Sequence, residues 1–344
     1  MPLSVRRQQG LLLLILFIGS VFGRVEAGSL SERMAAIEEE EDLRLGVYLK
    51  RMDSGETVSH RGGRPWYLAS TIKIPLAVAI LQKVDDGALS LTQELTLKES
   101  DYVDGSGDLQ NAAPGSQYTV DDLNFRSVAH SDSTATDMLI RLLGEEALNR
   151  QITERMVAEG FGPITTILQV RYEAYGEIHP RASELSNLDF IDLKNAGALP
   201  NRFTGFLEKL KLDADDVRAN SVAEAFERYY QTDLNAGSLS AMGLLLERIA
   251  KGELLSDQNN ERLLNYMRAV NTGDHRIKAG LPENVDFAHK TGTQIGRSCN
   301  VGIINPQPAS EAIVIAVCAE GYTSLMNAER AFSKVGKAVS EHWL

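Results

Sequence analysis

Predicted strands lie near both ends of this chain, and a long helical region separates them. Near the start, two short runs rich in strand-forming residues flank a turn, and three more runs of this kind follow residue 285. Between about residues 70 and 272 the apolar residues recur with helical spacing. The predicted strands are 43–51, 57–60, 286–296, 301–305 and 312–319, and the predicted helices are 31–42, 71–85, 119–129, 134–143, 148–160, 238–251, 259–269 and 325–344.

Because both ends of the chain supply strands, one sheet must be assembled from segments that are distant in sequence. This pattern predicts an α+β fold, with an antiparallel sheet flanked by helices and an all-helical lobe inserted into it. We expect residues 28–66 and 275–344 to form the α/β lobe and residues 67–274 to form the helical lobe. The cleft between two such lobes is where a binding site is expected.

Residues 1–27 have the pattern of a secretory signal peptide. Arg6 and Arg7 precede an apolar run from Leu11 to Phe22, and small residues at Val25 and Ala27 suit a cleavage site. The apolar run is short for a membrane-spanning helix. We therefore expect export to the periplasm or the exterior, cleavage after Ala27 and no stable membrane anchor.

The chain is acidic, with a formal net charge of −12. Removing residues 1–27, which carry three arginines and one glutamate, leaves −14. A surface of this charge argues against binding to nucleic acid or to anionic membranes. We expect a small-molecule partner and favour a monomer.

Ser70 and Lys73 stand three residues apart where a polar segment meets the apolar run 76–81. Positions i and i+3 share one face of a helix, so the Lys73 amine can reach the Ser70 hydroxyl. An adjacent base is one recognised way of activating a serine nucleophile. The S-x-x-K pattern alone is expected about once by chance in a chain of this length. It becomes informative only together with the motifs that follow it.

Two further motifs follow in order: Ser131-Asp132-Ser133, and Lys290-Thr291-Gly292 followed by Thr293. The order S-x-x-K, S-D-N, K-T-G marks class A β-lactamases and penicillin-binding proteins. The chain resembles this superfamily, with Ser133 where asparagine is usual. The run from Asn271 to Pro282 also resembles the class A sequence that precedes the K-T-G strand.

The resemblance implies a serine acyl hydrolase without a metal or cofactor. Ser70 would attack a carbonyl carbon, and Lys73 would be the base or its proton relay. Ser131 would pass a proton to the leaving nitrogen with help from Lys290. The N–H groups of Ser70 and Thr293 would form the oxyanion hole. The expected substrate-binding residues are Ser133, Thr291, Gly292, Thr293 and Arg276.

Each motif residue also has a structural alternative. Ser131 could cap the following helix, Lys290 could be an exposed strand residue, and Arg276 could be a surface charge. Motif order favours the functional interpretation for Ser131 and Lys290. Asp132 is expected to hold its own loop through hydrogen bonds. His179 and His275 have no partners at ligand spacing, so no metal is assigned.

The deacylating group is the least defined part of the predicted site. Arg171-Tyr172-Glu173 resembles the start of the class A loop whose glutamate activates water, which makes Glu173 the candidate base. The proline and asparagine expected after this glutamate are missing. Glu177 is a second candidate, and both carboxylates could instead be solvated loop residues. With Ser133 replacing asparagine, weak or selective β-lactam hydrolysis is expected.

Cys299 and Cys318 are the only cysteines of the chain. They lie at equal distances from the connection between the last two predicted strands. In an antiparallel hairpin they could face each other and form a disulfide in an oxidising compartment. A shift of register by one residue would leave two buried thiols instead.

The spacing from Ser131 to Lys290 exceeds that of a typical class A enzyme, and the excess lies at about residues 186–239. Helical apolar spacing recurs there at 203–212 and 221–230. The resemblance predicts a β-lactamase that works through an acyl-serine. Alternatives are an acyl hydrolase or peptidase acting on peptidoglycan peptides or esters, and a non-catalytic scaffold whose extra segment docks a partner.

Overall fold

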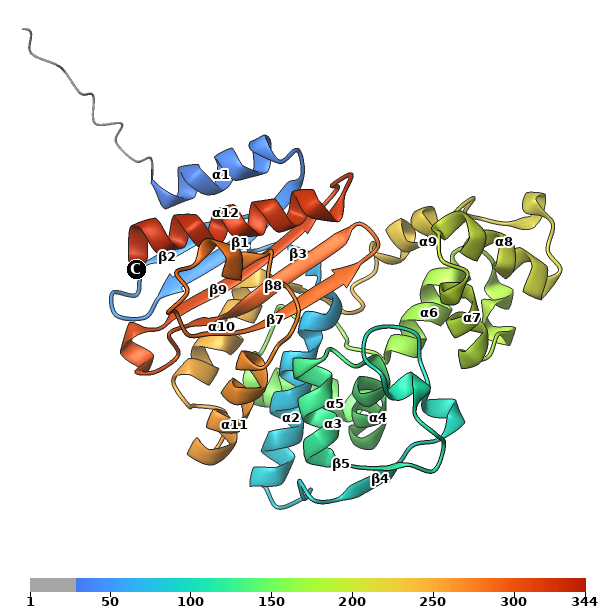
Figure 1. Cartoon of the computed structure of the whole chain (residues 1–344), viewed down its shortest axis with the longest axis horizontal. Helices are drawn as coiled ribbons and strands as arrows, with labels where there is room; N and C mark the ends of the chain where they lie inside the picture. Colours follow the sequence, from blue (N-terminus) through green and yellow to red (C-terminus); the bar gives the residue numbers. More distant parts are fainter. Residues whose placement is uncertain (1–28) are drawn as a thin grey trace, which may run out of the picture.

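The computed structural model describes residues 29–344, so the predicted signal segment lies outside the described residues. A five-stranded antiparallel sheet draws its strands from both ends of the chain, in the order β2-β1-β9-β8-β7 (Figure 1). Within it the first strand pairs with the last, with Arg44 opposite Glu320. The predicted fold class is confirmed. The strands are β1 (Arg44–Arg51), β2 (Thr57–His60), β7 (Phe287–Gln294), β8 (Arg297–Ile304) and β9 (Ile313–Glu320).

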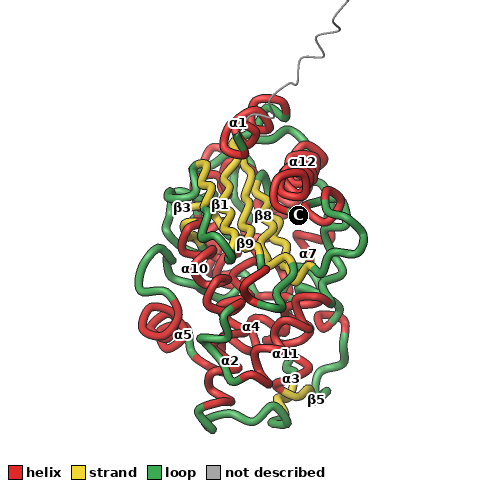
Figure 2. The backbone as a smooth tube through the Cα atoms, turned by 90° about the vertical axis from the view of Figure 1, so that its left-hand side faces the viewer, coloured by secondary structure: helices red, strands yellow, loops and turns green. Residues whose placement is uncertain are grey.

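Helices cover both faces of this sheet, as Figure 2 shows from the side. On one face α1 (Leu30–Glu40) and α12 (Leu325–Trp343) bury alternate strand residues, including Leu45 and Ile315. On the other face lies α10 (Leu239–Ala250), against which Val314 and Ala316 pack. Successive side chains of a strand point to opposite faces of the sheet, and here the side chains on both faces are buried. This is the pattern of a central strand whose two faces are both covered.

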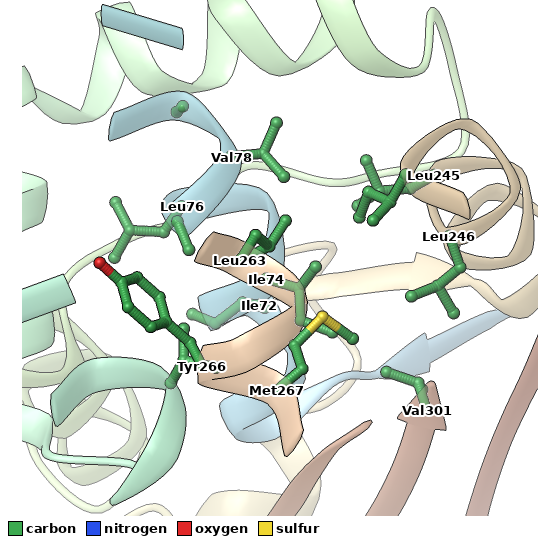
Figure 3. Close-up of a cluster of buried hydrophobic side chains, with 14 of the residues drawn as sticks. Ile72, Ile74, Leu76, Val78, Leu245, Leu246, Leu263, Tyr266, Met267 and Val301 are labelled. Atoms are coloured by element: carbon green, nitrogen blue, oxygen red, sulfur yellow. The ribbon is translucent and has the colours of Figure 1, made fainter. Parts of the chain in front are cut away.

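The central helical lobe packs below the sheet around the apolar helix α2. Figure 3 shows side chains of α2, α10 and α11 meeting Val301 of β8 in one continuous core. Ten consecutive residues of α2 are buried, so this helix is surrounded rather than amphipathic. The helices are α2 (Lys73–Asp85), α3 (Val120–Ala129), α4 (Ser133–Leu143), α5 (Glu145–Gln151) and α11 (Asp257–Arg268).

A second group of helices lies to one side of the sheet in Figure 1. Its core is separate and rich in aromatic residues, among them Phe190, Phe206 and Phe226, and it also includes Tyr67 and Ala69 next to Ser70. The segment at about 186–239 therefore packs against residues that precede the predicted nucleophile in the chain. The helices are α6 (Ile167–Gly176), α7 (Asn187–Asn195), α8 (Leu199–Leu210) and α9 (Val222–Tyr229).

Two short two-stranded sheets complete the fold. β3 (Pro65–Tyr67) pairs with β6 (Ala236–Ser238), and β4 (Glu94–Thr96) pairs with β5 (Gln117–Thr119). The first of these pairs holds the chain just before Ser70 against the end of the second helical group. Within residues 29–344 we find no helix that combines the length and apolarity required to cross a membrane.

The structure corrects several local expectations. The helix expected at 148–160 is α5, which ends at Gln151 and is followed by a π-helical turn, Ile152–Met156. The loop expected at about 171–180 is largely helical, because 167–176 form α6, whose first turn is capped by the Thr166 side chain. Strand β8 begins at Arg297 rather than at Val301, because it pairs with β9 along its whole length. Local sequence alone does not indicate these long-range contacts.

Candidate active site

Ser70 lies in a short 3₁₀ turn, η1 (Ala69–Ile72), that leads directly into α2. The turn begins at Ala69 with a φ of 47°, an uncommon left-handed conformation for a residue with a side chain. Strand β7 packs against this turn at Gly292. A Cβ built there would come within 2.7 Å of the Leu68 carbonyl oxygen and 3.0 Å of the Ser70 nitrogen. Only glycine lets the strand approach the serine so closely.

Lys73 is the first residue of α2 and is fully buried. Its Nζ donates hydrogen bonds to the Ser131 carbonyl oxygen at 2.6 Å and to Ser131 Oγ at 3.2 Å. Burial lowers the pKa of Lys73 to about 8, against the opposing effect of Asp132 and Asp137. A lysine with this pKa is partly neutral near physiological pH and can accept a proton.

The Ser131-Asp132-Ser133 motif forms a tight turn before α4. Ser131 has a φ of 55° and is buried, and its short side chain reaches Lys73. The Asp132 carboxylate caps α4 by accepting from the Ala135 nitrogen and also accepts from the nitrogens of Asp108 and Leu109. The structure thus gives Asp132 the loop-holding contacts that the sequence predicted.

Ser133 is the first residue of α4 and is buried against the loop 104–106. Its nitrogen donates to the Ser106 carbonyl oxygen at 2.9 Å. A Cβ on Gly105 would lie 2.0 Å from Ser133 Oγ, so the loop passes directly over this hydroxyl. The loop therefore limits how far a substrate can reach toward Ser133.

Lys290 and Thr291 lie on β7, and both are buried. Lys290 Nζ donates to the Thr291 carbonyl oxygen at 3.1 Å. Burial, followed by repulsion from Lys73 and Arg276, holds the pKa of Lys290 well below its usual value. Thr291 Oγ1 shares a hydrogen bond of 2.6 Å with Thr272 Oγ1. The site thus contains two buried amines, and the charge of Lys73 disfavours protonation of Lys290.

Arg276 is also buried, and its guanidinium is held by the sheet rather than exposed at the surface. It donates to the carbonyl oxygens of Gly292 at 3.0 Å and Cys299 at 2.9 Å, and to Thr293 Oγ1 at 2.7 Å. Burial lowers the pKa of Arg276, and Glu329 partly opposes this effect. Arg276 therefore fixes the end of β7 at which Thr293 lies.

A cavity opens beside the nucleophile and connects the motifs to the second helical group. Ser70, Ser133 and Thr293 line it together with residues of α6 through α9. Ile167 and Val170 of α6 supply an apolar wall. Lys73, Ser131 and Lys290 are buried and do not line this cavity.

The structure does not bring Glu173 or Glu177 to this cavity. Glu173 is exposed on α6, and its carboxylate accepts from Gln169 Nε2 at 2.7 Å. Glu177 caps the carboxyl end of the same helix. Because α6 replaces the expected loop, the positions of these two carboxylates are set by the helix. They do not lie on a loop that covers Ser70.

Several polar residues near the site were not anticipated from the sequence. Arg171 and Asp104 form a buried ion pair at 2.6 Å in the cavity wall. Asp137, fully buried on α4, accepts from the nitrogens of Ile167 at 2.6 Å and Leu168 at 2.9 Å, and its burial raises its pKa to about 6. No sequence signal pairs Asp104 with Arg171, because the two residues are 67 positions apart.

Cys299 and Cys318 form a disulfide between neighbouring strands. They are directly opposite each other in the register of β8 and β9, with a Cα–Cα distance of 4.0 Å. The register thus selects the disulfide over the alternative of two buried thiols. Among residues 29–344, no group of three or more histidine, cysteine or acidic side chains is arranged to hold a metal ion.

Together, the sheet assembled from both ends, the inserted helices and the three motifs at their junction define a class of protein. It is the class A β-lactamase and penicillin-recognising superfamily, as the motif order predicted. A model of the beta-lactamase enzyme family matches residues 29–343. The chain therefore belongs to the beta-lactamase enzyme family.

Relatives and solved structures agree with this assignment. The chain is 24% identical to β-lactamase VEB-1 of Pseudomonas aeruginosa over 97% of each protein. It is 25% identical to a β-lactamase of Mycobacterium tuberculosis, over 85% of this chain and 77% of that protein. An ancestral class A β-lactamase (GNCA) has a TM-score of 0.69 at 23% identity, covering 91% of this chain and 99% of that one.

A further solved structure with this fold is an acyl-enzyme complex. It is a point mutant of PBP-A with penicillin G, which has a TM-score of 0.65 at 24% identity and covers 91% of this chain and 94% of that one. At these identities the structural likeness establishes the fold. Chemistry must be argued from the residues of this chain.

Proposed function

We propose that this protein is an exported serine hydrolase that opens the amide of a β-lactam and carries the acyl group on Ser70. The hydrogen bond of Lys73 Nζ to Ser131 Oγ, at 3.2 Å, carries the proposal. This hydrogen bond connects the S-x-x-K motif to the Ser131 motif, and its two residues are 58 positions apart in the sequence. Membership of the beta-lactamase enzyme family supports a β-lactam as the substrate.

In the proposed acylation, Ser70 Oγ attacks the lactam carbonyl carbon while Lys73, acting as base or relay, takes up the hydroxyl proton. The C–N bond then breaks, and the nitrogen receives a proton through Ser131. The contact between Lys73 Nζ and Ser131 Oγ supplies the path for that proton. The nitrogens of Ser70 and Thr293, beside the close contact at Gly292, would stabilise the oxyanion.

We propose that Lys290, Thr291 and Thr293 receive the carboxylate of the substrate. Lys290 forms no ion pair with a carboxylate of the described residues, and burial depresses its pKa. A bound carboxylate would favour the protonated form of Lys290, because an opposite charge nearby stabilises an ammonium. Arg276 would act through Thr293 as a positioning residue, since it donates to Thr293 Oγ1.

Release of the acyl group is proposed to be slow. Hydrolysis of an acyl-serine needs a base that activates water, and Glu173 is exposed and does not line the cavity. The carboxylate among the cavity-lining residues, that of Asp104, is already paired with Arg171. Acylation should therefore outrun hydrolysis.

A mass spectrum of the purified protein, followed over time after addition of benzylpenicillin, tests both steps. We expect the mass to increase by one intact penicillin and the adduct to persist after free drug is removed. Ser70→Ala should show no adduct, whereas Ser183→Ala, which changes an exposed serine, should match the wild type. Absence of an adduct on the wild type, or an adduct that survives in Ser70→Ala, would refute the acyl-serine proposal.

The second candidate function is acyl transfer or hydrolysis on a peptidoglycan peptide or an ester. The apolar wall formed by Ile167 and Val170 offers no base for water, and this favours transfer of the acyl group to an acceptor other than water. Rapid turnover of a depsipeptide ending in D-lactate, together with persistence of the penicillin adduct, would favour this candidate. Rapid turnover of penicillin itself would favour a β-lactamase.

A further inference from the structure

The cavity beside Ser70 contains more positive than negative charge. Three cationic side chains line it: Arg171 on α6, Lys194 on α7 and Arg202 on α8. Asp104 is the one carboxylate among the lining residues. The chain as a whole carries a net charge of −12, so this concentration of cations runs against its composition.

Arg171 is buried and incompletely paired. Its Nε donates to Asp104 Oδ1 at 2.6 Å, and its Nη2 lies 3.4 Å from the Asp104 carbonyl oxygen. Its Nη1 is buried and has no hydrogen-bond partner among the described residues. Buried donors of a guanidinium are normally satisfied, so Arg171, a residue of the cavity wall, retains one unused donor.

Lys194 and Arg202 form no ion pairs with carboxylates of residues 29–344. Lys194 Nζ donates to the Gly105 carbonyl oxygen at 2.7 Å, which uses one of its three donors. Arg202 Nε donates to the Gly197 carbonyl oxygen at 2.7 Å. Burial lowers the pKa of Lys194; Asp104 opposes this effect, while Arg171 and Arg202 add to it. The two arginines therefore raise the cost of charging Lys194.

The position of the cavity defines which part of a substrate these cations would meet. Lys73 and Ser131, to which the proposed function assigns the proton path, and Lys290, to which it assigns the substrate carboxylate, do not line it. Ser70, Ser133 and Thr293 do. The cavity is therefore assigned to the side chain on the acyl side of the C–N bond.

We propose that Arg171, Lys194 and Arg202 form a subsite for a carboxylate on the acyl portion of the substrate. Arginine matches a carboxylate with two parallel hydrogen bonds, and such charge-assisted bonds are strong where water is excluded. The natural acyl donor would then carry an acidic side chain in addition to any carboxylate at Lys290. This subsite rests on the proposed function for its orientation, but its anion binding can be measured without acylation.

Carbenicillin and benzylpenicillin are suitable probes because they differ by one carboxylate on the acyl side chain. Binding of each to Ser70→Ala is measured by calorimetry, so that no covalent step contributes. We expect carbenicillin to bind about tenfold more tightly, as one additional charge-assisted contact would give. The ratio should fall to about one when Lys194→Met and Arg202→Met are added.

Lys211→Gln is the matched control, because this exposed lysine directly follows α8 and does not line the cavity. It should keep the preference for carbenicillin. Arg202→Gln alone, at a half-exposed position, should reduce the preference if the double substitution does not fold. No measurable binding of carbenicillin, equal binding of the two penicillins, or an unchanged ratio in the Lys194 and Arg202 variants overturns the subsite.

Acylation of the wild type by the same two compounds separates this inference from the proposed function. A carbenicillin preference in Ser70→Ala without any adduct on the wild type supports the subsite and refutes the acyl-serine chemistry. An adduct without a carbenicillin preference supports the chemistry and overturns the subsite. The two failures are therefore distinguishable.

Discussion

Lys73 is the residue on which the proposed chemistry depends most directly. Its amine is fully buried and bonded to Ser131, and burial brings its pKa to about 8. An ordinary lysine is protonated at neutral pH and is a poor base. The fold therefore turns an ordinary residue into one that can exchange a proton under physiological conditions.

Acylation by penicillin should accelerate with rising pH, because only the neutral Lys73 amine accepts a proton. With a pKa of about 8, the neutral fraction rises about fivefold between pH 7 and pH 8. The rate of adduct formation, measured by mass spectrometry from pH 6.5 to 9, should follow this curve. Lys73→Arg, which stays protonated, should lose acylation at every pH. A flat profile in the wild type would exclude Lys73 as the base.

Replacing Ile167 by glutamate should speed release of the acyl group. Ile167 is the first residue of α6 and lines the cavity with Ser70, so this substitution places a carboxylate at the cavity wall. General base catalysis should then raise the hydrolysis rate of the penicillin adduct at least about 100-fold. The readout is the decay of the adduct mass. Ile167→Gln controls for shape and should leave the decay slow; equal decay in both variants would contradict the prediction.

For single residues, the order of the motifs identified candidate site residues, but the sequence did not indicate which side chains contact one another. Ser70, Lys73, Ser131 and Lys290 could be singled out because their motifs have fixed spacing and order. The cations of the cavity could not be, since Arg171, Lys194 and Arg202 lie on three separate helices. Their convergence depends on how those helices pack, and that information is not local.

Among the elements, the contact of β7 with the nucleophile turn matters most. Gly292 leaves room for the Leu68 carbonyl oxygen and the Ser70 nitrogen, and Arg276 holds the same strand through the Gly292 carbonyl oxygen. The distance between the two proposed oxyanion donors is thus set by backbone packing. A side chain at this position would change that distance.

Gly292→Ala should impair acylation far more than folding. The added methyl group must displace β7 from the turn, and loss of one oxyanion donor costs about 100-fold in rate. Overpacking of this kind should lower the free energy of unfolding by about 1–3 kcal/mol. Gly63→Ala, where nothing lies within 4 Å of the new Cβ, is the control for both readouts. Wild-type acylation kinetics in Gly292→Ala would show that the close contact is dispensable.

Helix α6 illustrates why one element could not be predicted. Its sequence resembles a segment that forms a loop in the superfamily, and no long apolar run contradicts that interpretation. In the structure Thr166 and Asp137 cap its first turn, and Val170, Ala174 and Tyr175 are buried in the second helical group. Tertiary packing therefore decides the local conformation here.

Asp137→Asn should destabilise the protein through α6. Both carboxylate oxygens accept backbone N–H groups of Ile167 and Leu168, and an amide would turn one acceptor into a donor. We expect the free energy of unfolding to fall by about 1–3 kcal/mol. Denaturant titration provides the measurement, with Asp215→Asn, at an exposed site outside α6, as the control. Equal midpoints for both variants would show that the cap is not needed.

For the whole molecule, the decisive feature is a sheet shared by the two ends of the chain. The sequence pattern predicted this arrangement because strands are predicted near both ends of the chain and helices between them. The disulfide between β8 and β9 reinforces the C-terminal part of this sheet. The register that brings the cysteines together could not be settled from sequence, since a shift of one residue reverses every side chain.

Removing the disulfide should lower the free energy of unfolding without changing the path of the backbone. The cysteines are separated by 19 residues, and closing a loop of this size in the unfolded chain stabilises the native state by about 3 kcal/mol. Cys299→Ala combined with Cys318→Ala should lower the denaturant midpoint accordingly. Wild-type protein unfolded under a reducing phosphine should show the same loss. Coincident transitions with and without the bridge would contradict this expectation.

The pairing of β1 with β9 also sets the order of events during biosynthesis. Strand β1 lies between β2 and β9, and its eight-residue ladder with β9 cannot form before residues 313–320 have left the ribosome. Until then one edge of the β1–β2 hairpin is open, and such a hairpin is only marginally stable by itself. The nascent polypeptide must therefore remain without the pairing of β1 and β9 until residues 313–320 have been synthesised.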